Sequence, residues 1–346
     1  MTNIKNLTDK GQSIWLDSIS KQMIESGDLK NLIDAGITGI TSNPSIFEKA
    51  ISSSESYDKK IMELSKNSSN SKEIFEEIAT DDIRNAADIL NPVYEESNNN
   101  DGFVSLEVDP FLANDLEKTV SEAHRLWDKV NRDNLMIKIP GTTEGIKATQ
   151  LLLEDGINVN VTLLFSFNSY KKTIESFIKS KNKNEKSKSV ASFFISRIDT
   201  ATDGLIDHKN KLFHKMAIIN AFRSYNLFKT NRAKMGGNFQ KLLWASTSVK
   251  AKDLNQEYYS YNLPLENTIN TLPLETIDYL LKSKIFSSDN LGISNDFEIL
   301  FEESKKDFNF EEITNSLLVN GIKLFQDSYS SVLATIDQKI SKLVNK

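Results

Sequence analysis

The stretch NLMIKIP, Asn134–Pro140, is a short apolar run with one lysine set inside it. Apolar residues on both sides of Lys138 are typical of a strand that is covered on both faces of a sheet. Lysine is rarely buried without a partner. Lys138 therefore either extends its ammonium group to water at the end of the strand or supplies an amine for chemistry.

Seven similar runs lie on either side of this stretch. The eight runs cover residues 13–19, 36–44, 102–110, 134–140, 158–165, 190–198, 241–247 and 266–273. Between them, apolar residues recur with the spacing of one helix face in the segments 81–90, 113–130, 166–180 and 208–230. Strands that alternate with helices predict a parallel sheet, most simply a closed (β/α)8 barrel of the TIM type. An open doubly wound sheet is the alternative, but the Gly-rich phosphate loops of its nucleotide-binding forms are missing.

The chain of 346 residues has no Pro- or Gly-rich linker, so we expect one domain over residues 1–346. The tail, about 296–343, has the pattern of two helices appended to the barrel. We expect its aromatic residues to pack as core contacts, with closure over the barrel mouth as the lesser alternative. These residues are Phe297, Phe301, Phe308, Phe310 and Phe325. The basic stretch 180–189 is expected to be a solvated loop, because no aromatic residue is interleaved in it.

Composition excludes several kinds of site. There are no cysteines, which rules out disulfides, thiolate metal sites and cysteine nucleophiles. The three histidines, His124, His208 and His214, do not occur at the H-x-x-x-H spacing. A histidine-built zinc site or a Ser-His-Asp triad is therefore not expected, and we predict no metal.

Charge and hydropathy exclude other classes of partner. The formal net charge of −6 disfavours general affinity for nucleic acids or membranes. No apolar run approaches the ~20 residues of a membrane span, and the N-terminus lacks the apolar segment of a secretory signal. We expect a cytoplasmic protein, and the sequence leaves its state, monomer or homodimer, open.

Polar residues stand near the ends of the runs, where a parallel barrel gathers its reactive groups. In chain order they are Asp17, Thr41, Asn43, Glu107, Asp109, Lys138, Asn158, Asn160, Thr162, Ser192, Arg197 and Ser246. Three have simpler explanations: Asp17 could cap the next helix, Asn43 could form a turn with Pro44, and Arg197 could pair with a neighbouring carboxylate. Taken together they predict a polar substrate pocket, because an unpaired buried charge costs several kcal/mol.

This set of groups is suited to imine chemistry. A neutral lysine amine attacks a ketone, water leaves, and the protonated imine accepts the electrons of the neighbouring C–C bond as that bond breaks. Glu107 would shuttle protons through a water, and Asp17 would take the proton from the hydroxyl at the breaking bond. Direct contact with a carboxylate would favour the charged amine, so we expect spacing or a bridging water beside Lys138.

At these residues the sequence resembles the transaldolases, and specifically their longer bacterial subfamily. The resemblance runs through GQSIWLDSIS, GITSNPSIFEKAI, VSLEVDP, MIKIPGTTEGI, INVNVTLLFS, SFFISRIDT, LLWASTSVK and NTINTLP, nearly the whole chain. It implies a barrel whose imine-forming lysine is on the fourth strand, the run that holds Lys138. It also implies no metal or organic cofactor, because the lysine itself supplies the electron sink.

The resemblance also implies roles for individual residues. Lys138 forms the imine and Asp17 is the base for C–C cleavage. Glu107 is the acid/base that acts through a bound water, which Thr162 helps to hold. The implied substrate-binding residues are Thr41, Asn43, Asn160, Ser192, Arg197 and Ser246.

One departure concerns the substrate phosphate. The commoner form of the family follows the seventh strand with Ser-x-Arg, and the arginine binds the phosphate. This chain has Ser248 at that position, and the nearest following cation is Lys250. Lysine can hold a phosphate as a point charge, without the paired hydrogen bonds of an arginine.

The implied activity is reversible transfer of a dihydroxyacetone unit from sedoheptulose 7-phosphate to glyceraldehyde 3-phosphate, giving erythrose 4-phosphate and fructose 6-phosphate. This reaction belongs to the non-oxidative pentose phosphate pathway, so the expected partners are sugar phosphates. A fructose 6-phosphate aldolase with the same lysine is the first alternative. A catalytically silent barrel that binds sugar phosphates or serves as a scaffold is a weaker one, because Lys138, Asp17 and Glu107 are all present.

Overall fold

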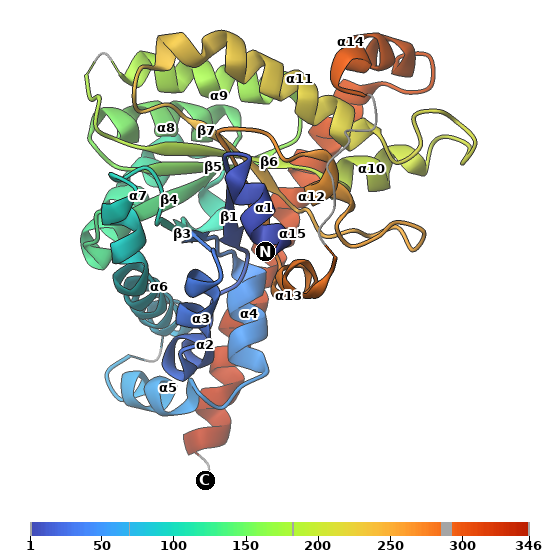
Figure 1. The fold of residues 1–346 in the computed structure, drawn as a ribbon. Coiled ribbons are helices and arrows are strands. Elements are labelled where there is room, and N and C mark those ends of the chain that lie inside the picture. Colours follow the sequence, from blue (N-terminus) through green and yellow to red (C-terminus); the bar gives the residue numbers. More distant parts are fainter. Residues whose placement is uncertain (1, 69, 182, 285–292, 345–346) are drawn as a thin grey trace.

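The computed structural model describes residues 2–68, 70–181, 183–284 and 293–344, and its centre is a closed barrel of parallel strands in chain order (Figure 1). Each strand pairs with the next, and β1 pairs with β8 to close the ring. The strands are β1 (Gln12–Leu16), β2 (Gly39–Ile40), β3 (Val104–Glu107), β4 (Leu135–Pro140), β5 (Val159–Leu164), β6 (Ser189–Phe194), β7 (Lys241–Ala245) and β8 (Thr268–Leu272). The predicted (β/α)8 barrel is confirmed, and the open-sheet alternative is wrong.

Helices surround the barrel and extend beyond it. They are α1 (Asn3–Asp9), α2 (Lys21–Ser26), α3 (Asp28–Asp34), α4 (Pro44–Ser52), α5 (Asp58–Ser65), α6 (Ser71–Glu96), α7 (Leu116–Val130), α8 (Thr143–Glu154), α9 (Phe167–Ser180), α10 (Ser196–Asp203), α11 (Met216–Asn231), α12 (Tyr258–Asn262), α13 (Leu274–Lys282), α14 (Ile293–Ser304) and α15 (Phe310–Val344). Two 3-10 turns, η1 (Pro110–Leu112) and η2 (Arg232–Met235), complete the elements of the described residues.

The predicted helical segments correspond to α6, α7, α9 and α11, with the largest displacements at the ends of α6 and the start of α11. α6 begins ahead of the predicted segment 81–90, because the Asn70 side chain accepts the Lys72 N–H and caps the helix there. α11 begins later than the predicted 208. Before it, the side chains of Asp207 and Asn210 accept backbone N–H groups two residues on, which stabilises turns rather than helix.

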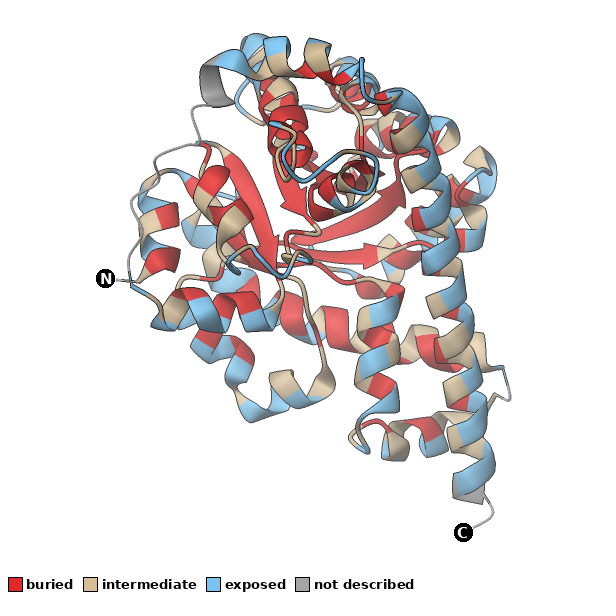
Figure 2. Ribbon diagram, turned by 90° about the vertical axis from the view of Figure 1, so that its right-hand side faces the viewer, coloured by how far each residue is buried: buried red, intermediate tan, exposed pale blue. Residues whose placement is uncertain are grey.

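A buried tryptophan packs closely against the second strand inside the barrel. Trp15 is fully buried in β1, and its Nε1 donates a 2.7 Å hydrogen bond to Asp101. Gly39 lies opposite Trp15 in the register of β1 and β2, and a Cβ there would stand 2.4 Å from the indole. Only glycine fits at this position. Figure 2 shows the strands as the mostly buried centre of the molecule.

The tail forms the two predicted helices, α14 and α15. α15 is 35 residues long and runs from the barrel down past α4 towards the C-terminus (Figures 1 and 2). The loop 180–189 and the domain 1–346 include residues outside the described ranges, and the single domain stays a prediction. No described helix combines the length and the apolar character that a membrane crossing requires.

Candidate active site

Lys138 and Glu107 occupy equivalent positions on neighbouring strands. They are register partners near the ends of β4 and β3, and each side chain is 5% exposed. Lys138 Nζ lies 3.8 Å from Glu107 Oε2, which is ion-pair distance but too long for a normal hydrogen bond. Instead the amine donates a 2.8 Å hydrogen bond to the carbonyl oxygen of Ser42. The ammonium group is enclosed in the barrel, so the interpretation that it reaches water at the strand end is wrong.

Glu107 is poised to exchange a proton near neutral pH. Burial raises its pKa to about 7; the positive charge of Lys138 opposes this rise and the carboxylate of Asp17 adds to it. Neither carboxyl oxygen accepts a hydrogen bond from the residues that the structure describes. Such a group can both give and take a proton at the pH of a cell.

Asp17 follows β1 and lies in the same cluster. Its backbone N–H donates to Leu272, so the strand pairing continues to this residue. Thr41 Oγ1 donates a 2.7 Å hydrogen bond to its carboxylate. Burial raises the pKa of Asp17, while Lys138 and this hydrogen bond lower it. The helix-cap explanation is wrong, because Ser20 caps α2.

Asn160 and Ser192 are brought together inside the barrel. Ser192 Oγ donates to Asn160 Oδ1 at 2.7 Å, and Asn160 Nδ2 donates to Ser105 Oγ at 2.9 Å. All three are buried, and Asn160 is the register partner of Lys138 on β5. Thr162 lies two residues further along the same face of β5, and its buried hydroxyl bonds to none of the described residues.

Thr41 and Asn43 lie on the segment between β2 and α4. Besides Asp17, Thr41 Oγ1 contacts Thr271 Oγ1 at 2.7 Å. Asn43 Oδ1 accepts from the N–H groups of Ser45 and Ile46 at 3.0 and 3.1 Å, which caps α4. The turn explanation is therefore confirmed for the side-chain oxygen of Asn43. The predicted run 36–44 contains only the two-residue strand β2, and its last residue, Pro44, begins α4.

Of the three residues expected to bind the phosphate, Arg197 and Ser246 lie near each other, and Lys250 lies apart from them. Arg197 is half-buried on α10, its guanidinium is 5.3 Å from the centroid of the Phe194 ring, and burial lowers its pKa. No described carboxylate lies within ion-pair distance of it, so the pairing explanation is wrong. Ser246 Oγ is 3.2 Å from Ser196 Oγ, beside Arg197 on α10. Lys250 is exposed beyond β7 and bonds to none of these residues in the described chain.

Two other polar residues next to strand ends, Asp109 and Asn158, make their contacts away from Lys138. Asp109 accepts from Lys72 at 2.6 Å and also caps η1 through the N–H of Phe111. The Asn158 side chain donates to the carbonyl oxygens of Asp133 and Leu135, next to the start of β4. Neither contributes to the cluster around Lys138.

Two contacts of Lys138 were not predicted: the carbonyl of Ser42 and the ring of Phe325. Phe325 is buried in the core as expected, and its ring centroid also lies 5.6 Å from Lys138 Nζ, so the lesser alternative, a position at the barrel mouth, applies to it as well. Other tail aromatics follow that expectation: Phe301 and Phe310 meet edge to face at 5.3 Å. The apolar spacing of the tail predicts a buried face but does not say which ring meets the barrel mouth.

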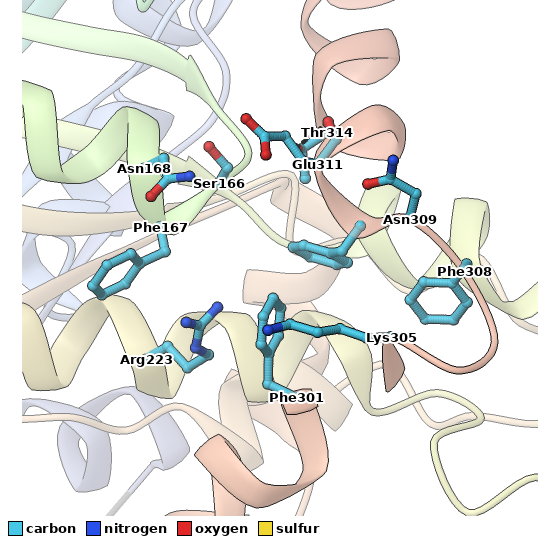
Figure 3. A pocket seen from close by; sticks show the side chains of 11 residues that line it. Ser166, Phe167, Asn168, Arg223, Phe301, Lys305, Phe308, Asn309, Glu311 and Thr314 are labelled. Carbon is cyan, nitrogen blue, oxygen red and sulfur yellow. Dashed lines mark hydrogen bonds between the residues drawn. The ribbon is translucent and has the colours of Figure 1, made fainter. Parts of the chain in front are cut away.

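A separate cavity of about 440 Å³ lies between α9, α11, α14 and the start of α15 (Figure 3). The Arg223 guanidinium enters it between two rings. Its central carbon lies 4.9 Å from the centroid of the Phe167 ring and 3.5 Å from the centroid of the Phe301 ring. Its Nε pairs with Glu298 at 3.0 Å, which ties α11 to α14. None of the predicted site residues is among the described residues that line this cavity. The candidate site is therefore the cluster at the barrel mouth.

Comparisons with known proteins agree with this geometry. A family model described as transaldolase/fructose-6-phosphate aldolase matches residues 14–336. A protein named transaldolase from Trichodesmium erythraeum is 41% identical, covering 99% of this chain and 98% of that protein. A protein named transaldolase 2 from Nostoc sp. is 38% identical, covering 99% of each. A protein named transaldolase from Saccharopolyspora erythraea is 36% identical, covering 99% of this chain and 98% of the relative. The chain belongs to the transaldolase/fructose-6-phosphate aldolase family.

Proposed function

We propose that this chain is a transaldolase that carries a dihydroxyacetone unit on Lys138 as a Schiff base. The donor is sedoheptulose 7-phosphate, the acceptor is glyceraldehyde 3-phosphate, and the reaction runs in both directions within the non-oxidative pentose phosphate pathway. The observation that carries the proposal is an enclosed amine 3.8 Å from a carboxyl group whose pKa burial raises to about 7. Full-length similarity to proteins named transaldolase supports the same activity.

Glu107 acts during imine formation. The neutral Lys138 amine adds to the ketone carbon of the donor, and the carbinolamine then loses water. Glu107 gives a proton to the departing hydroxyl and recovers one when water returns to hydrolyse the imine. A carboxyl group with a pKa of about 7 suits both steps, because it is partly protonated at neutral pH. We assign to Thr162 the role of holding the water through which the proton moves.

Asp17 acts during cleavage. Its carboxylate takes the proton from the C4 hydroxyl, the C3–C4 bond breaks, and the electron pair moves to the protonated imine to give a neutral enamine. The aldehyde product leaves with its new carbonyl. In the second half the enamine carbon attacks the acceptor aldehyde, and Asp17 returns the proton to the new hydroxyl. The charges of Lys138 and Asp17 therefore change together.

The remaining residues bind the substrate. We assign the hydroxyls of the dihydroxyacetone unit to Thr41, Asn43, Asn160 and Ser192, and the phosphate to Arg197, Ser246 and Lys250. Asn160 and Ser192 already bond to one another, so their free donors and lone pairs are fixed in direction. For Arg197 the support is a half-buried guanidinium that lacks a carboxylate partner among the described residues. We further propose a single-domain cytoplasmic enzyme, monomeric or dimeric, without nucleic-acid or membrane partners.

A fructose 6-phosphate aldolase is the second candidate, because the family description names both activities. It would use the same imine and enamine. The difference is that the enamine takes a proton and free dihydroxyacetone is released. Comparing free dihydroxyacetone with transferred product decides between the two.

The test of the proposed chemistry is borohydride reduction in the presence of fructose 6-phosphate, followed by peptide mass spectrometry. The expected result is a three-carbon adduct on the peptide that contains Lys138. A chain that forms no adduct, under conditions that trap a known imine-forming aldolase, lacks the proposed mechanism. An adduct on another lysine would move the site away from β4.

A further inference from the structure

α15 is fastened to the elements that form the barrel mouth. Gln326 Nε2 donates to the carbonyl oxygen of Pro110 at 3.3 Å, next to the end of β3. The ring of Tyr329 meets those of Phe75 and Phe111 edge to face, at 5.5 and 6.4 Å. These contacts hold the middle of the helix against the side of the mouth where Glu107 stands.

The turn before these contacts faces the opposite side of the mouth. Gly321 packs so closely that a Cβ there would lie 2.9 Å from the Leu163 side chain and 3.7 Å from Arg197 Nη1. α15 therefore spans the mouth from the β5 and α10 side to the η1 side. Phe325 is between the two anchored turns, one helical turn beyond Gly321 and one before Tyr329.

Phe325 is directed at the reacting nitrogen. Its ring centroid is 5.6 Å from Lys138 Nζ, and the residue is 6% exposed. Positions four residues apart lie on one face of a helix, so Gly321, Phe325 and Tyr329 form one row against the mouth. The neighbouring Leu324 is 52% exposed and points away from that row.

We propose that Phe325 determines whether the dihydroxyacetone unit held on Lys138 is transferred to an acceptor or released. This inference rests on the proposed function. The ring covers one side of the imine nitrogen and of the nucleophilic enamine carbon, and it keeps water and its protons from that side. It is a specificity-determining residue for the second half of the reaction.

The enamine on Lys138 has two fates that differ in one step. In transfer, its nucleophilic carbon forms a C–C bond with the acceptor aldehyde, and the aldehyde oxygen takes a proton from Asp17. In release, the same carbon takes a proton from water, which restores the protonated imine, and the hydroxide that remains takes the proton that Asp17 gained during cleavage. A water molecule then adds to that imine, the C–N bond breaks, and free dihydroxyacetone and the amine result. Hydrolysis of an imine by water ends both routes, because the product of transfer is also held on Lys138 until its imine is hydrolysed. Only protonation of the enamine carbon by water is specific to release.

An aromatic ring suits this position for two reasons. It is large and apolar, and excluding water from one side of the enamine protects its nucleophilic carbon from protonation. Its face also attracts the positive charge of the protonated imine, which a branched aliphatic side chain of similar size does not. The first effect changes the ratio of release to transfer. The second changes the rate of both routes and leaves the ratio as it is.

The experiment measures that ratio in a graded series, Phe325→Tyr, Phe325→Leu and Phe325→Ala. Fructose 6-phosphate is the donor and erythrose 4-phosphate the acceptor, and free dihydroxyacetone is quantified against sedoheptulose 7-phosphate. The expected ratio is unchanged in the Tyr variant and about tenfold higher in the Ala variant, with Leu between them. Leu324→Ala is the matched control on the exposed side of the helix and keeps the wild-type ratio.

The ratio is insensitive to loss of folded enzyme, because both products come from the same intermediate. If the Ala variant cannot be obtained folded, the Leu and Tyr variants are compared instead. An unchanged ratio in the folded Leu and Ala variants overturns the inference, and so does an equal rise in Leu324→Ala. Failure of the proposed function gives a different result, since wild-type enzyme would then either form no borohydride adduct or release only free dihydroxyacetone without transfer.

Discussion

Glu107 and Lys138 are register partners at the ends of adjacent strands, and their charged groups lie 3.8 Å apart inside the barrel. In a parallel sheet, residues in register point to the same face. A slip of one residue in the pairing of β3 and β4 would turn one of the two side chains towards the outer helices. The acid and the amine are therefore held together by backbone pairing rather than by a bond between them.

Replacing Lys138 with methionine should abolish transfer while the protein stays folded. Methionine fills a similar volume, so packing is kept, but it has no amine to form an imine. We expect kcat to fall by at least about 10⁴-fold. Activity assays and borohydride trapping measure the loss, and a circular-dichroism melt checks the fold. Transfer at an undiminished rate in this variant would disprove the Schiff-base mechanism.

Replacing Glu107 with glutamine should remove one limb of the pH profile of kcat. In the wild type that limb lies near pH 7, the pKa to which burial raises Glu107. The rate should drop by about 10²–10⁴-fold, the usual contribution of a general acid–base. The measurement is kcat against pH for both proteins, and a limb that persists near pH 7 in the variant would assign it to another group.

The same substitution predicts a change in stability with pH. Because the folded pKa of Glu107 is raised above its ordinary value of 4.5, the folded state holds its proton more tightly than the unfolded state does. Its contribution to stability is thus fully present below about pH 4.5 and is lost as the pH rises through about 7. The free energy of unfolding of the wild type relative to Glu107→Gln should fall across this window in urea titrations. A constant difference from pH 4 to 8 would contradict the raised pKa.

Replacing Asp17 with asparagine should separate imine formation from cleavage. Asparagine still accepts the hydrogen bond from Thr41 but cannot take the proton of the C4 hydroxyl. With fructose 6-phosphate and borohydride, we expect the adduct on the Lys138 peptide to carry six carbons instead of three. Mass spectrometry distinguishes the two adducts directly. A three-carbon adduct at the wild-type rate would assign the cleavage base to another residue.

Arg197 and Lys250 should differ in their importance for phosphate binding. The half-buried guanidinium of Arg197 can make charged hydrogen bonds, so Arg197→Met should raise KM for fructose 6-phosphate about 10–100-fold. Lys250 is exposed, and Lys250→Met should raise KM by no more than about threefold. Steady-state kinetics at two salt concentrations measure both. The reverse order would place the phosphate at the loop after β7.

The sequence predicted the order of the barrel strands well, because each buried parallel strand is a nearly continuous apolar run. Lys138, Glu107 and Asp17 stood out for the same reason, since each interrupts or ends such a run. Residue types with strong local preferences also predicted some details correctly. One is the turn at Asn43, whose side chain caps α4.

Features that depend on the path of distant elements could not be predicted. The position of Phe325 over Lys138 follows from how a long helix crosses the mouth, and the spacing of apolar residues in the tail only indicates a buried face. The partner of the Lys138 amine is a backbone carbonyl, which every residue has, so no residue type pointed to Ser42. The start of α11 was missed because side chains of the preceding segment bond to its own backbone.

The anchoring of α15 has a consequence for synthesis of the protein. Further along this helix, Ser331 and Lys339 bond to Glu48 and Asp58 of α4 and α5, so the last part of the chain docks on one of the first. Chains emerge from the ribosome N-terminus first, and the barrel strands are complete some forty residues before α15 begins. A nascent chain can thus possess the amine and both carboxyl groups before it possesses the ring that covers them. The amine is covered only after the residues of α15 have been synthesised.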